Sequence, residues 1–272
     1  WMVIAPDGPL RIDATVVPHA AFWQKLAAVS GVELQEPVAA AHLTGTWQRP
    51  EGTAQLKAAR IVIDPKRVKQ ALPAIENLDV QLTGDRGGVT LNTFAVAIEG
   101  QLVRARGRLP LPEGKWSELF KSPLAAARRG ADLRLEVPGA DVAVFARFLP
   151  AVLAPKGRFE ADLTYRRGGV EGFVKLRDAA SRPLGPLGVL QEISADIALS
   201  GRKLALRGVT ARSGGQPVTL AGTIELPEGE APRFELTLKG ENLPFVRQTG
   251  LLVRGDLDLK LQTPANAPPR LS

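Results

Sequence analysis

Internal repetition constrains the fold of this chain more than any other sequence feature. The stretches 78–114 and 195–229 match at alternate positions of their first strands, and both end in Leu-Pro-Glu-Gly. After a two-residue deletion in the turn, the offset between them is constant from Gly100 to Gly114. A repeat of this kind predicts supersecondary units stacked one on the next, which act through a long surface rather than through one pocket.

The repeat extends in both directions, so we expect one continuous repeat array over residues 1–272. In this interpretation residues 1–64 are the tail of an earlier repeat, 65–177 and 178–263 are repeats, and 264–272 are a linker. About two and a half copies of a unit of roughly 100 residues are then present. The chain begins with Trp1 and ends in TPANAPPRLS, and we interpret it as a segment of a longer protein.

The local pattern is that of β-strands with one apolar face. Apolar and polar residues alternate with period two in Gly157–Gly168, Phe234–Gly240 and Gly255–Gln262. Antiparallel strands commonly bury one face and expose the other, so these strands are predicted to be antiparallel. Turn signals at 84–88, 168–169, 201–202 and 213–215 separate the strands, of which we expect about fourteen.

A few short helices are expected between the strands. Asp64, Ser117 and Asp141 precede apolar runs and are candidate N-caps, and Pro65 suits the first position of a helix. The predicted helices are His19–Val29, Pro65–Leu72, Trp116–Arg128, Asp141–Leu153 and Leu243–Gly250.

The side chains that enzymes and metal sites require are scarce. The chain has no cysteine and two histidines, His19 and His42, with no carboxylate at ligand spacing. No nucleophile elbow, phosphate-binding loop or dinucleotide fingerprint occurs. The carboxylates lie on the polar phase of the alternating strands, where a solvated face is expected. We therefore expect no catalytic residues, no metal, no cofactor and no enzymatic activity.

The basic character of the chain favours anionic partners. Its net charge of +7 and pI near 10 fit nucleic acid, lipid headgroups or an acidic surface. Arginines at 104, 106 and 108 form a stripe, whereas the second copy has Thr219, Ala221 and Thr223 at the matching positions. Nucleic-acid modules interleave basic residues with stacking aromatics, and aromatics make up only 5% of this chain. We therefore expect no nucleic-acid partner and interpret the stripe as a solvated edge or outer face.

Three stretches carry the rhythm of the strands most clearly: GTWQRPEGTAQLKAARIVI at 45–63, VTLAGTIELPEG at 218–229 and GDLDLKLQT at 255–263. Together they resemble the TamB and AsmA-like superfamily of periplasm-spanning proteins. The resemblance covers most of the chain and rests on a rhythm of hairpins with one apolar face. The N-terminal membrane helix and the C-terminal domain of that family are not found here, so the chain is expected to be an interior segment.

The resemblance implies a mainly β fold, an elongated antiparallel β-repeat curled into an open, taco-like hydrophobic groove with a few short helices. It also implies a role, in which the groove is expected to accommodate phospholipid acyl chains that move between inner and outer membrane, in support of outer-membrane biogenesis. The location implied is the periplasm, in a parent protein anchored in the inner membrane through a region outside this segment. A TamA-like outer-membrane protein is an implied partner, again through regions outside the segment.

The apolar phase of the strands supplies the candidate lining of such a groove. These side chains are almost all aliphatic, so burial at about 25 cal/mol per Å² is enough to hold an acyl chain without hydrogen bonds. The predicted lining residues are Val80, Leu82, Val89, Leu91, Leu133, Leu135, Phe159, Leu163, Ile197, Leu199, Leu204, Leu206, Val218, Leu220, Leu236, Leu238, Leu257 and Leu259.

Two other functions fit the same pattern. A scaffold for the assembly of outer-membrane proteins and autotransporters would pair an open sheet edge with client strands, by strand augmentation. A structural or adhesive β-repeat module would instead bury the apolar phase in the closed core of a sandwich or barrel. From the sequence alone, the open groove and the closed core remain alternatives.

Overall fold

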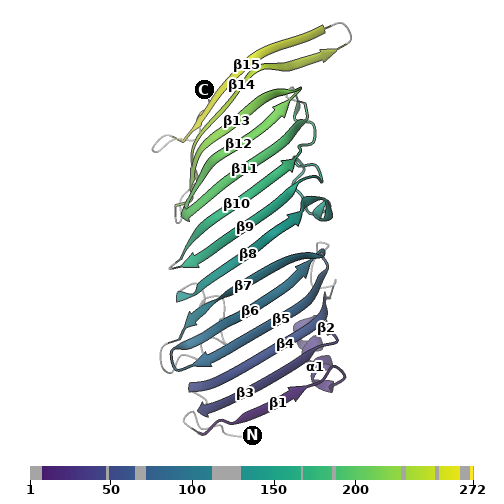
Figure 1. The fold of residues 1–272 in the computed structure, drawn as a ribbon, viewed down its shortest axis with the longest axis vertical. Helices are drawn as coiled ribbons and strands as arrows, with labels where there is room; N and C mark the ends of the chain where they lie inside the picture. Colours follow the sequence, from purple (N-terminus) through teal and green to yellow (C-terminus); the bar gives the residue numbers. More distant parts are fainter. Residues whose placement is uncertain are drawn as a thin grey trace. The chain divides into compact units, whose positions relative to one another are not determined.

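A computed structural model describes residues 8–46, 49–64, 72–111, 130–166, 168–185, 188–227, 231–248, 251–263 and 270–271. In this part of the chain sixteen strands form an open antiparallel sheet, and strands that follow one another in sequence lie side by side (Figure 1). The exception is β2, which pairs with β4 and lets β1 pair with β3. The prediction of a mainly β fold with an open antiparallel sheet and few helices is confirmed.

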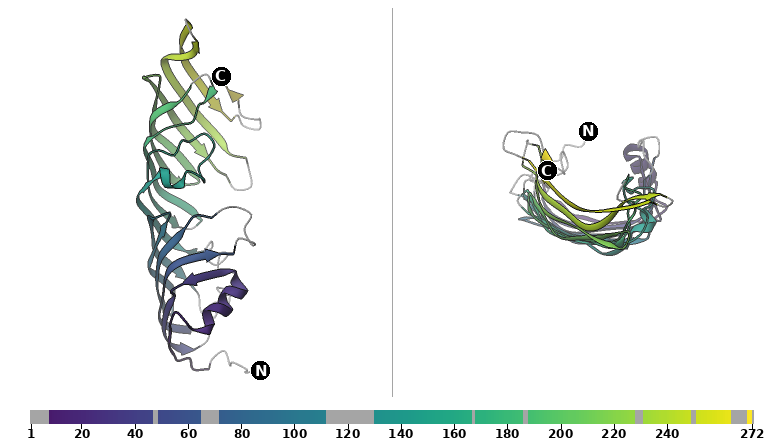
Figure 2. Two further views of the ribbon diagram at one scale, coloured as in Figure 1. Left: turned by 90° about the vertical axis from the view of Figure 1, so that its right-hand side faces the viewer. Right: turned by 90° about the horizontal axis from the view of Figure 1, so that it is seen from above.

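Internal contacts divide the chain into two units. Unit 1 contains residues 1–136 and 164–168, and unit 2 contains residues 137–163 and 169–272. Within each unit the strands bend, so that the sheet curves about one of its faces (Figure 2). The curvature belongs to a single layer of strands, which is the arrangement expected of an open sheet rather than a sandwich.

The described residues of unit 1 form a meander of strands that also includes the helix α1. Within it, β4 pairs with β3 along its first half and with β2 along its second half. The predicted turn at 84–88 is confirmed, since Arg86 and Gly87 separate β5 from β6. The elements are β1 (Ile12–Val16), α1 (Ala21–Ser30), β2 (Val32–Gln35), β3 (Val38–Thr46), β4 (Arg49–Ile63), β5 (Ile75–Asp85), β6 (Gly88–Ile98), β7 (Gln101–Pro110) and the first half of β8 (Asp132–Asp141).

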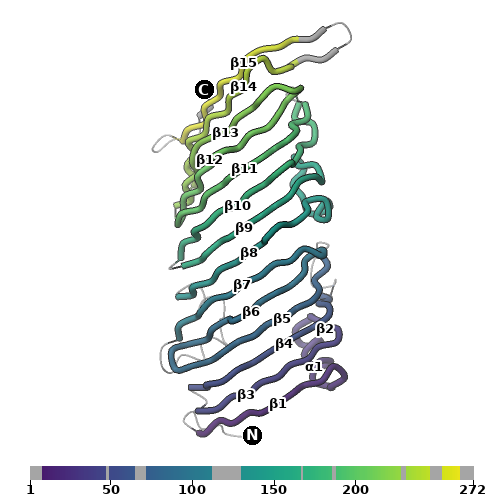
Figure 3. The backbone as a smooth tube through the Cα atoms, in the orientation of Figure 1, coloured from purple at the N-terminus to yellow at the C-terminus, as the bar shows by residue number. Residues whose placement is uncertain are grey.

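Unit 2 repeats the meander, and its backbone runs back and forth through successive strands (Figure 3). The predicted turns at 168–169, 201–202 and 213–215 are confirmed, since each lies at a strand junction. The elements are the second half of β8, η1 (Val142–Phe145), β9 (Arg158–Arg166, of which the last three residues belong to unit 1), β10 (Gly169–Ala179), β11 (Leu190–Gly201), β12 (Lys203–Ser213), β13 (Gln216–Glu225), β14 (Arg233–Gln248), β15 (Leu251–Gln262) and β16 (Arg270–Leu271).

Helix α1 confirms the helix predicted near 19–29, although it begins at Ala21. Gly31 ends it in the left-handed conformation (φ 72°), with its N–H donated to the carbonyl of Ala27 at 2.7 Å. Trp23 is the buried residue of this helix, and its indole N–H donates to the carbonyl of Val17 at 2.9 Å. The helix lies on the concave side of its unit (Figure 2).

The helix predicted at 243–250 is wrong, because β14 continues to Gln248 and pairs with β15. A bulge at Asn242 (φ 53°) shifts the register, and the side chain of Leu243 beyond it is fully buried. A helix of eight residues gains little in isolation. Pairing with β15 instead gives the backbone of this segment ladder partners along one side as far as Gln248.

The helix predicted at 141–153 is confirmed only at its beginning. Asp141 caps it as predicted, because its Oδ1 accepts a hydrogen bond from the backbone N–H of Ala143 at 2.8 Å. The helix is a single 3₁₀ turn, Val142–Phe145, followed by turns. Pro150, which has no N–H to continue a helical ladder, lies within the predicted span. The helices predicted at 65–72 and 116–128 fall outside the described residues, apart from Leu72.

Candidate functional site

In unit 2 the apolar side chains of successive strands share one face of the sheet. Residues directly opposite each other in an antiparallel pair point to the same face, so the register identifies the members of that face. One row across the sheet is Leu199, Leu204, Ile224 and Phe234. The next rows are Ile197, Leu206, Gly222, Leu236 and Leu261, then Ala195, Val209, Leu220, Leu238 and Leu259.

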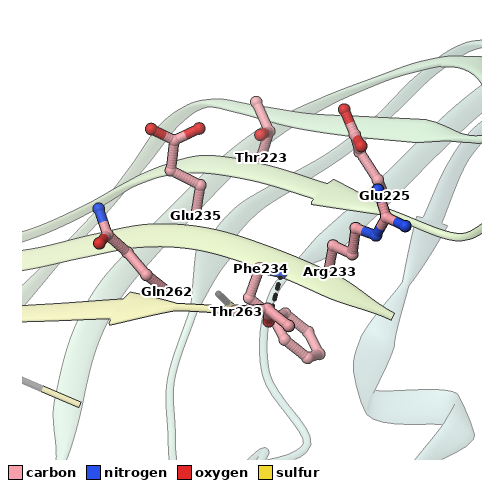
Figure 4. Close-up of a pocket in the computed structure, with 7 residues that line it drawn as sticks. All are labelled: Thr223, Glu225, Arg233, Phe234, Glu235, Gln262 and Thr263. Atoms are coloured by element: carbon pink, nitrogen blue, oxygen red, sulfur yellow. Dashed lines mark hydrogen bonds between the residues drawn. The ribbon is translucent and has the colours of Figure 1, made fainter. Parts of the chain in front are cut away.

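The opposite face of unit 2 is polar. Glu235, Thr223 and Glu225 point to one side of the sheet, whereas Phe234 points to the other (Figure 4). Cross-strand ion pairs join Lys203 to Glu225 at 3.4 Å and Lys239 to Asp258 at 3.6 Å. A hollow of about 300 Å³ at the strand ends is lined by Thr223, Glu225, Arg233, Phe234, Glu235, Gln262 and Thr263.

Unit 1 has the same two-faced construction. One apolar row across β1–β8 is Ala14, Ala41, Ala54, Leu82, Leu91, Gly107 and Leu133. The neighbouring row is Val16, Ala39, Leu56, Val80, Phe94, Ala105 and Leu135. At one end of this face Ala58, Leu78 and Val96 form a small buried cluster, against which Leu34 of β2 packs.

The predicted lining residues lie on these apolar faces. The register places Val80, Leu82, Val89, Leu91, Leu133 and Leu135 on the face of unit 1, and the ten predicted residues from Ile197 to Leu259 on that of unit 2. Phe159 and Leu163 share one face of β9. Gly172 of β10 lies opposite Leu199 of the apolar face, and a Cβ atom on Gly172 would lie 3.1 Å from the Cα atom of Leu163. Their function as a lining stays a prediction.

Partial exposure is the property that these residues share. Val218 is 3% exposed and Leu135 is 38% exposed, and the other sixteen lie between the buried and exposed classes. Core residues of a closed sandwich are mostly fully buried. An aliphatic face that stays partly accessible over many strands is therefore the surface of an open sheet and is available to an apolar ligand.

The polar face of unit 1 concentrates arginine around β7 and β8. Arg104, Arg106 and Arg108 of β7 lie opposite Glu136, Arg134 and Asp132 of β8, so one arginine directly faces another. A hollow of about 530 Å³ opens between them, lined by Thr90, Leu91, Asn92, Arg106, Gly107, Arg108, Asp132, Arg134, Thr164 and Arg166. This basic hollow brings together residues of β6, β7, β8 and β9.

Carboxylates neutralise part of this charge. Arg108 forms a two-pronged ion pair with Asp85 at 2.7 and 2.9 Å, and Arg166 donates to Asp132 at 2.8 Å. Hydrogen bonding by Arg108, reinforced by the N–H of Gly87, lowers the pKa of Asp85 below its ordinary value of 3.8. The same pair raises the pKa of Arg108.

Sequence reasoning identified the arginines of β7 but missed Arg134 and Arg166. Both lie on the polar phase of their own strands, so their outward orientation was readable from the alternation. Their proximity to Arg106 depends on the pairing of β7 with β8, and no sequence signal fixes that register.

Other chemistry is sparse in the described part of the chain. Nδ1 of His42 lies 3.6 Å from Oδ2 of Asp13, and both side chains are exposed. No group of three or more histidine, aspartate or glutamate side chains in the described residues could hold a metal ion. Among the described helices, none combines the length and the apolar character needed to cross a membrane.

Comparisons with protein-family models, with curated proteins and with solved structures find no match for this chain. The functional argument therefore rests on the two faces of the sheet and on its edges.

Proposed function

We propose that the chain is a segment of a TamB-like periplasmic bridge, whose apolar face accommodates phospholipid acyl chains on their way between the inner and outer membrane. The observation that supports this most directly is the partly exposed aliphatic face in each unit, with no polar side chain in its central rows. The proposed parent protein is anchored in the inner membrane, and its contact with a TamA-like partner lies outside this segment.

The dimensions of unit 2 fit an acyl chain. Half of a bilayer's hydrocarbon core is about 15 Å thick, which is the length one acyl chain spans. Strands lie about 4.8 Å apart, so four neighbouring strands cover that length. Unit 2 offers β10–β15, and Leu236, Leu238 and Leu259 lie near the middle of the β13–β15 rows. Burial against such a surface gives affinity without specificity, which suits a conduit that must also release its ligand.

The test is native mass spectrometry of the purified chain with lipid extraction in parallel. We expect phospholipid to co-purify with the parent protein and to be lost in Leu236→Glu. The matched control is Thr237→Glu, which places the same charge one residue further along β14 on the polar face. Circular dichroism and the unfolding midpoint verify that both variants fold. A lipid-free parent, or a Leu236→Glu variant that binds as much lipid as Thr237→Glu, contradicts the proposal.

The unpaired sheet edges favour a second candidate function, a scaffold that pairs with strands of outer-membrane proteins and autotransporters. In the described residues β16 pairs only with Leu261 and Gln262, so β15 from Leu251 to Lys260 offers backbone donors and acceptors on one side. Such an edge is a template for strand addition. A photo-crosslinker at Asp256 in β15 is expected to capture client polypeptide, whereas one at Asp196 in the interior strand β11 is not. Equal capture at both positions contradicts this candidate.

The structural or adhesive module with a closed core requires a second layer over the apolar face. Within the described ranges the strands form one open sheet, and the predicted lining residues are mostly half-buried. A closed core would leave them buried, so this candidate has the least support.

A further inference from the structure

Helix α1 of unit 1 exposes three large apolar side chains on one of its faces. The helix lies in the connection between the end of β1 at Val16 and the start of β3 at Val38, beside the strand ends (Figure 1). Phe22, Leu26 and Val29 are 52%, 38% and 80% exposed. Because they are spaced by four and three residues, they lie on one face of the helix and form what we call the apolar stripe.

The helix is held to the protein by a different side. Its buried residue is Trp23, whose indole N–H donates to the carbonyl of Val17 and whose ring packs edge-on against Phe22 at 5.0 Å between centroids. The other residues of α1 are exposed, apart from the half-buried Ala27. The fold therefore presents the apolar stripe to the outside, and an exposed apolar patch of this kind marks an interaction site.

The equivalent connection in unit 2 has the same property. It follows β8 and covers residues 142–157, and its residues Phe145, Leu149 and Val152 match the three residues of the apolar stripe at one constant offset. The exposed large apolar residues here are Val144, Phe148 and Val152, at intervals of four. This connection begins with a 3₁₀ turn instead of an α-helix. Exposure of apolar side chains is thus kept in both units although the backbone differs.

The charge of both connections has one sign. Residues 14–32, which include α1, and residues 142–157 contain no aspartate or glutamate, although the chain has 28 of these residues. The flanking carboxylates belong to strands, and one of them, Asp141, caps η1. The first range contains His19 and Lys25, and the second contains an arginine and a lysine. Such a composition is complementary to an anionic surface.

Cations lie next to the exposed apolar side chains in both places. Lys25 precedes Val29 by four residues and is therefore its neighbour on the surface of α1. The guanidinium carbon of Arg147 lies 4.8 Å from the centroid of the Phe148 ring. A bilayer with acidic phospholipids is negative at its surface and apolar directly beneath, so it matches both kinds of side chain at once.

We infer that α1, and separately the connection at 142–157, binds the surface of a bilayer that contains acidic phospholipids. The apolar stripe enters the boundary between headgroups and acyl chains, and Lys25 stays at the level of the phosphates. A second copy of the chain suits the stripe less well. A stable dimer buries about 800 Å² on each partner, and three partly covered side chains fall short of that area. This contact goes beyond the proposed conduit, because it involves the connections at the strand ends and not the apolar face.

The first test is flotation with vesicles of phosphatidylcholine, with and without phosphatidylglycerol. The double variant Phe22→Ser with Val29→Ser removes the stripe at constant charge. The matched control, Gln24→Ser with Ala28→Ser, changes two exposed residues of α1 outside the stripe. We expect the parent and the control to bind the acidic vesicles more tightly than the neutral ones, and the stripe variant to bind the acidic vesicles at least about tenfold more weakly than the parent.

The connection in unit 2 is tested in the same way. Phe148→Ser with Val152→Ser is expected to weaken flotation with acidic vesicles. Combined with the stripe variant, it should reduce binding to the level that neutral vesicles give. Circular dichroism and the unfolding midpoint verify that every variant folds.

A second test locates the helix in the bilayer. The chain has no cysteine, so one introduced cysteine carries an environment-sensitive fluorophore at a single position. With acidic vesicles, we expect the emission of a probe at Val29→Cys to shift to the blue and to be quenched by lipids with brominated acyl chains. A probe at Gln24→Cys, outside the stripe, should change little.

Three results would overturn the inference. The first is equal flotation of the parent, the stripe variant and the control, and the second is an equal response of the two probes, because either would assign adhesion to net charge alone. The third is a parent that does not bind vesicles but forms a dimer that the stripe variant does not form, measured by sedimentation velocity. Co-purifying phospholipid, measured in the same preparations, is expected to be unchanged in the stripe variant, so failure of the conduit and failure of the membrane contact are seen separately.

Discussion

Strands β5–β7 and β11–β13 are two copies of one three-stranded meander that agree on one face and differ on the other. By register on the apolar face, the row Leu82, Leu91 and Gly107 of the first copy corresponds to the row Ile197, Leu206 and Gly222 of the second. On the polar face, the arginines at 104, 106 and 108 correspond to Thr219, Ala221 and Thr223. The apolar face thus holds what the two copies have in common, whereas the polar face holds what distinguishes them.

The agreement includes an irregularity. Leu91 faces Gly107 and Leu206 faces Gly222, and in both copies the register shifts directly after that pair. Beyond the shift the apolar side chains Phe94 and Val209 return to the same face, because a bulge inserts an extra residue into the alternation. The bulge is therefore part of the repeated design and keeps the apolar face continuous.

The largest loss of stability is expected when a side chain is introduced at the two shared glycines, because it would clash with the backbone of the neighbouring strand. A Cβ atom on Gly107 would lie 2.1 Å from the backbone oxygen of Asp132, and one on Gly222 would lie 1.9 Å from that of Glu235. We expect Gly107→Val and Gly222→Val each to lower the free energy of unfolding by about 3 kcal/mol or more. Gly222→Val should cost more, because its φ of 136° also disfavours a side chain. Urea denaturation measures both. Gly208→Ala, where a Cβ atom meets nothing within 4 Å, is the control and should be near neutral.

A second comparison concerns β8 and β14, which occupy equivalent positions in the two copies, beside β7 and β13. Gly240 and Leu243 of β14 correspond to Val137 and Ala140 of β8, so large and small residues are exchanged. A Cβ atom on Gly240 would lie 2.7 Å from a methyl carbon of the fully buried Leu243. We expect Leu243→Ala to cost about 2–4 kcal/mol and Gly240→Val about 1–3 kcal/mol.

The double variant Gly240→Val with Leu243→Ala should be more stable than the sum of the two effects predicts, because valine fills the space that leucine leaves. A double-mutant cycle by thermal or urea unfolding measures this coupling. Strict additivity would show that the side chains at 240 and 243 do not occupy the same space. It would contradict the proposed exchange of large and small residues between β8 and β14.

A smaller effect is expected from moving the arginine pair between copies. Ala221→Arg with Thr237→Arg places two cations opposite each other in β13 and β14. We expect a loss of about 0.2–1 kcal/mol in low salt. The loss should shrink in 1 M salt, where screening shortens the reach of charge. A salt-independent loss would assign the effect to packing instead of charge.

The smallest effect concerns the ion pair of Asp85 with Arg108 in the first copy. The second copy has Thr223 at the position of Arg108 and therefore lacks this pair. Arg108 lowers the pKa of Asp85, so the folded state favours the carboxylate. The stabilisation is complete above the ordinary pKa of 3.8 and is lost as the pH falls through the lowered value in the folded protein. Arg108→Thr, which introduces the residue of the second copy, should return the pKa of Asp85 towards its ordinary value. Titration of the carboxyl carbon by NMR measures this, and an unchanged pKa would contradict the assigned cause.

The alternation of apolar and polar residues made the strands and their faces predictable. In β15, Leu257, Leu259 and Leu261 alternate with Asp256, Asp258 and Lys260, and no other regular structure places these leucines on one side. The turns were predictable for a similar reason, since Gly88, Gly214 and Gly215 adopt backbone conformations that other residues avoid. The candidate apolar lining followed from the same alternation.

Two features were missed because they depend on strand pairing, which the sequence of a single segment does not reveal. The second half of β14 has a proline and a glycine-bounded apolar run that fit a short helix, and only pairing with β15 decides for a strand. The basic hollow depends on which residue of β8 faces Arg106, which is a property of the assembled sheet. The bulges were also invisible, because one extra residue in a strand leaves its composition unchanged.

The order of the strands has a kinetic meaning as well. Almost every strand pairs with the strands immediately before and after it in the chain, so most contacts span only two strands and a turn. Chains with such local contacts close short loops and fold quickly, and stability can propagate from one hairpin to the next. Each new hairpin can therefore dock on a template that is already formed, so that the chain can acquire its structure progressively, from one end, while the remainder is still unfolded.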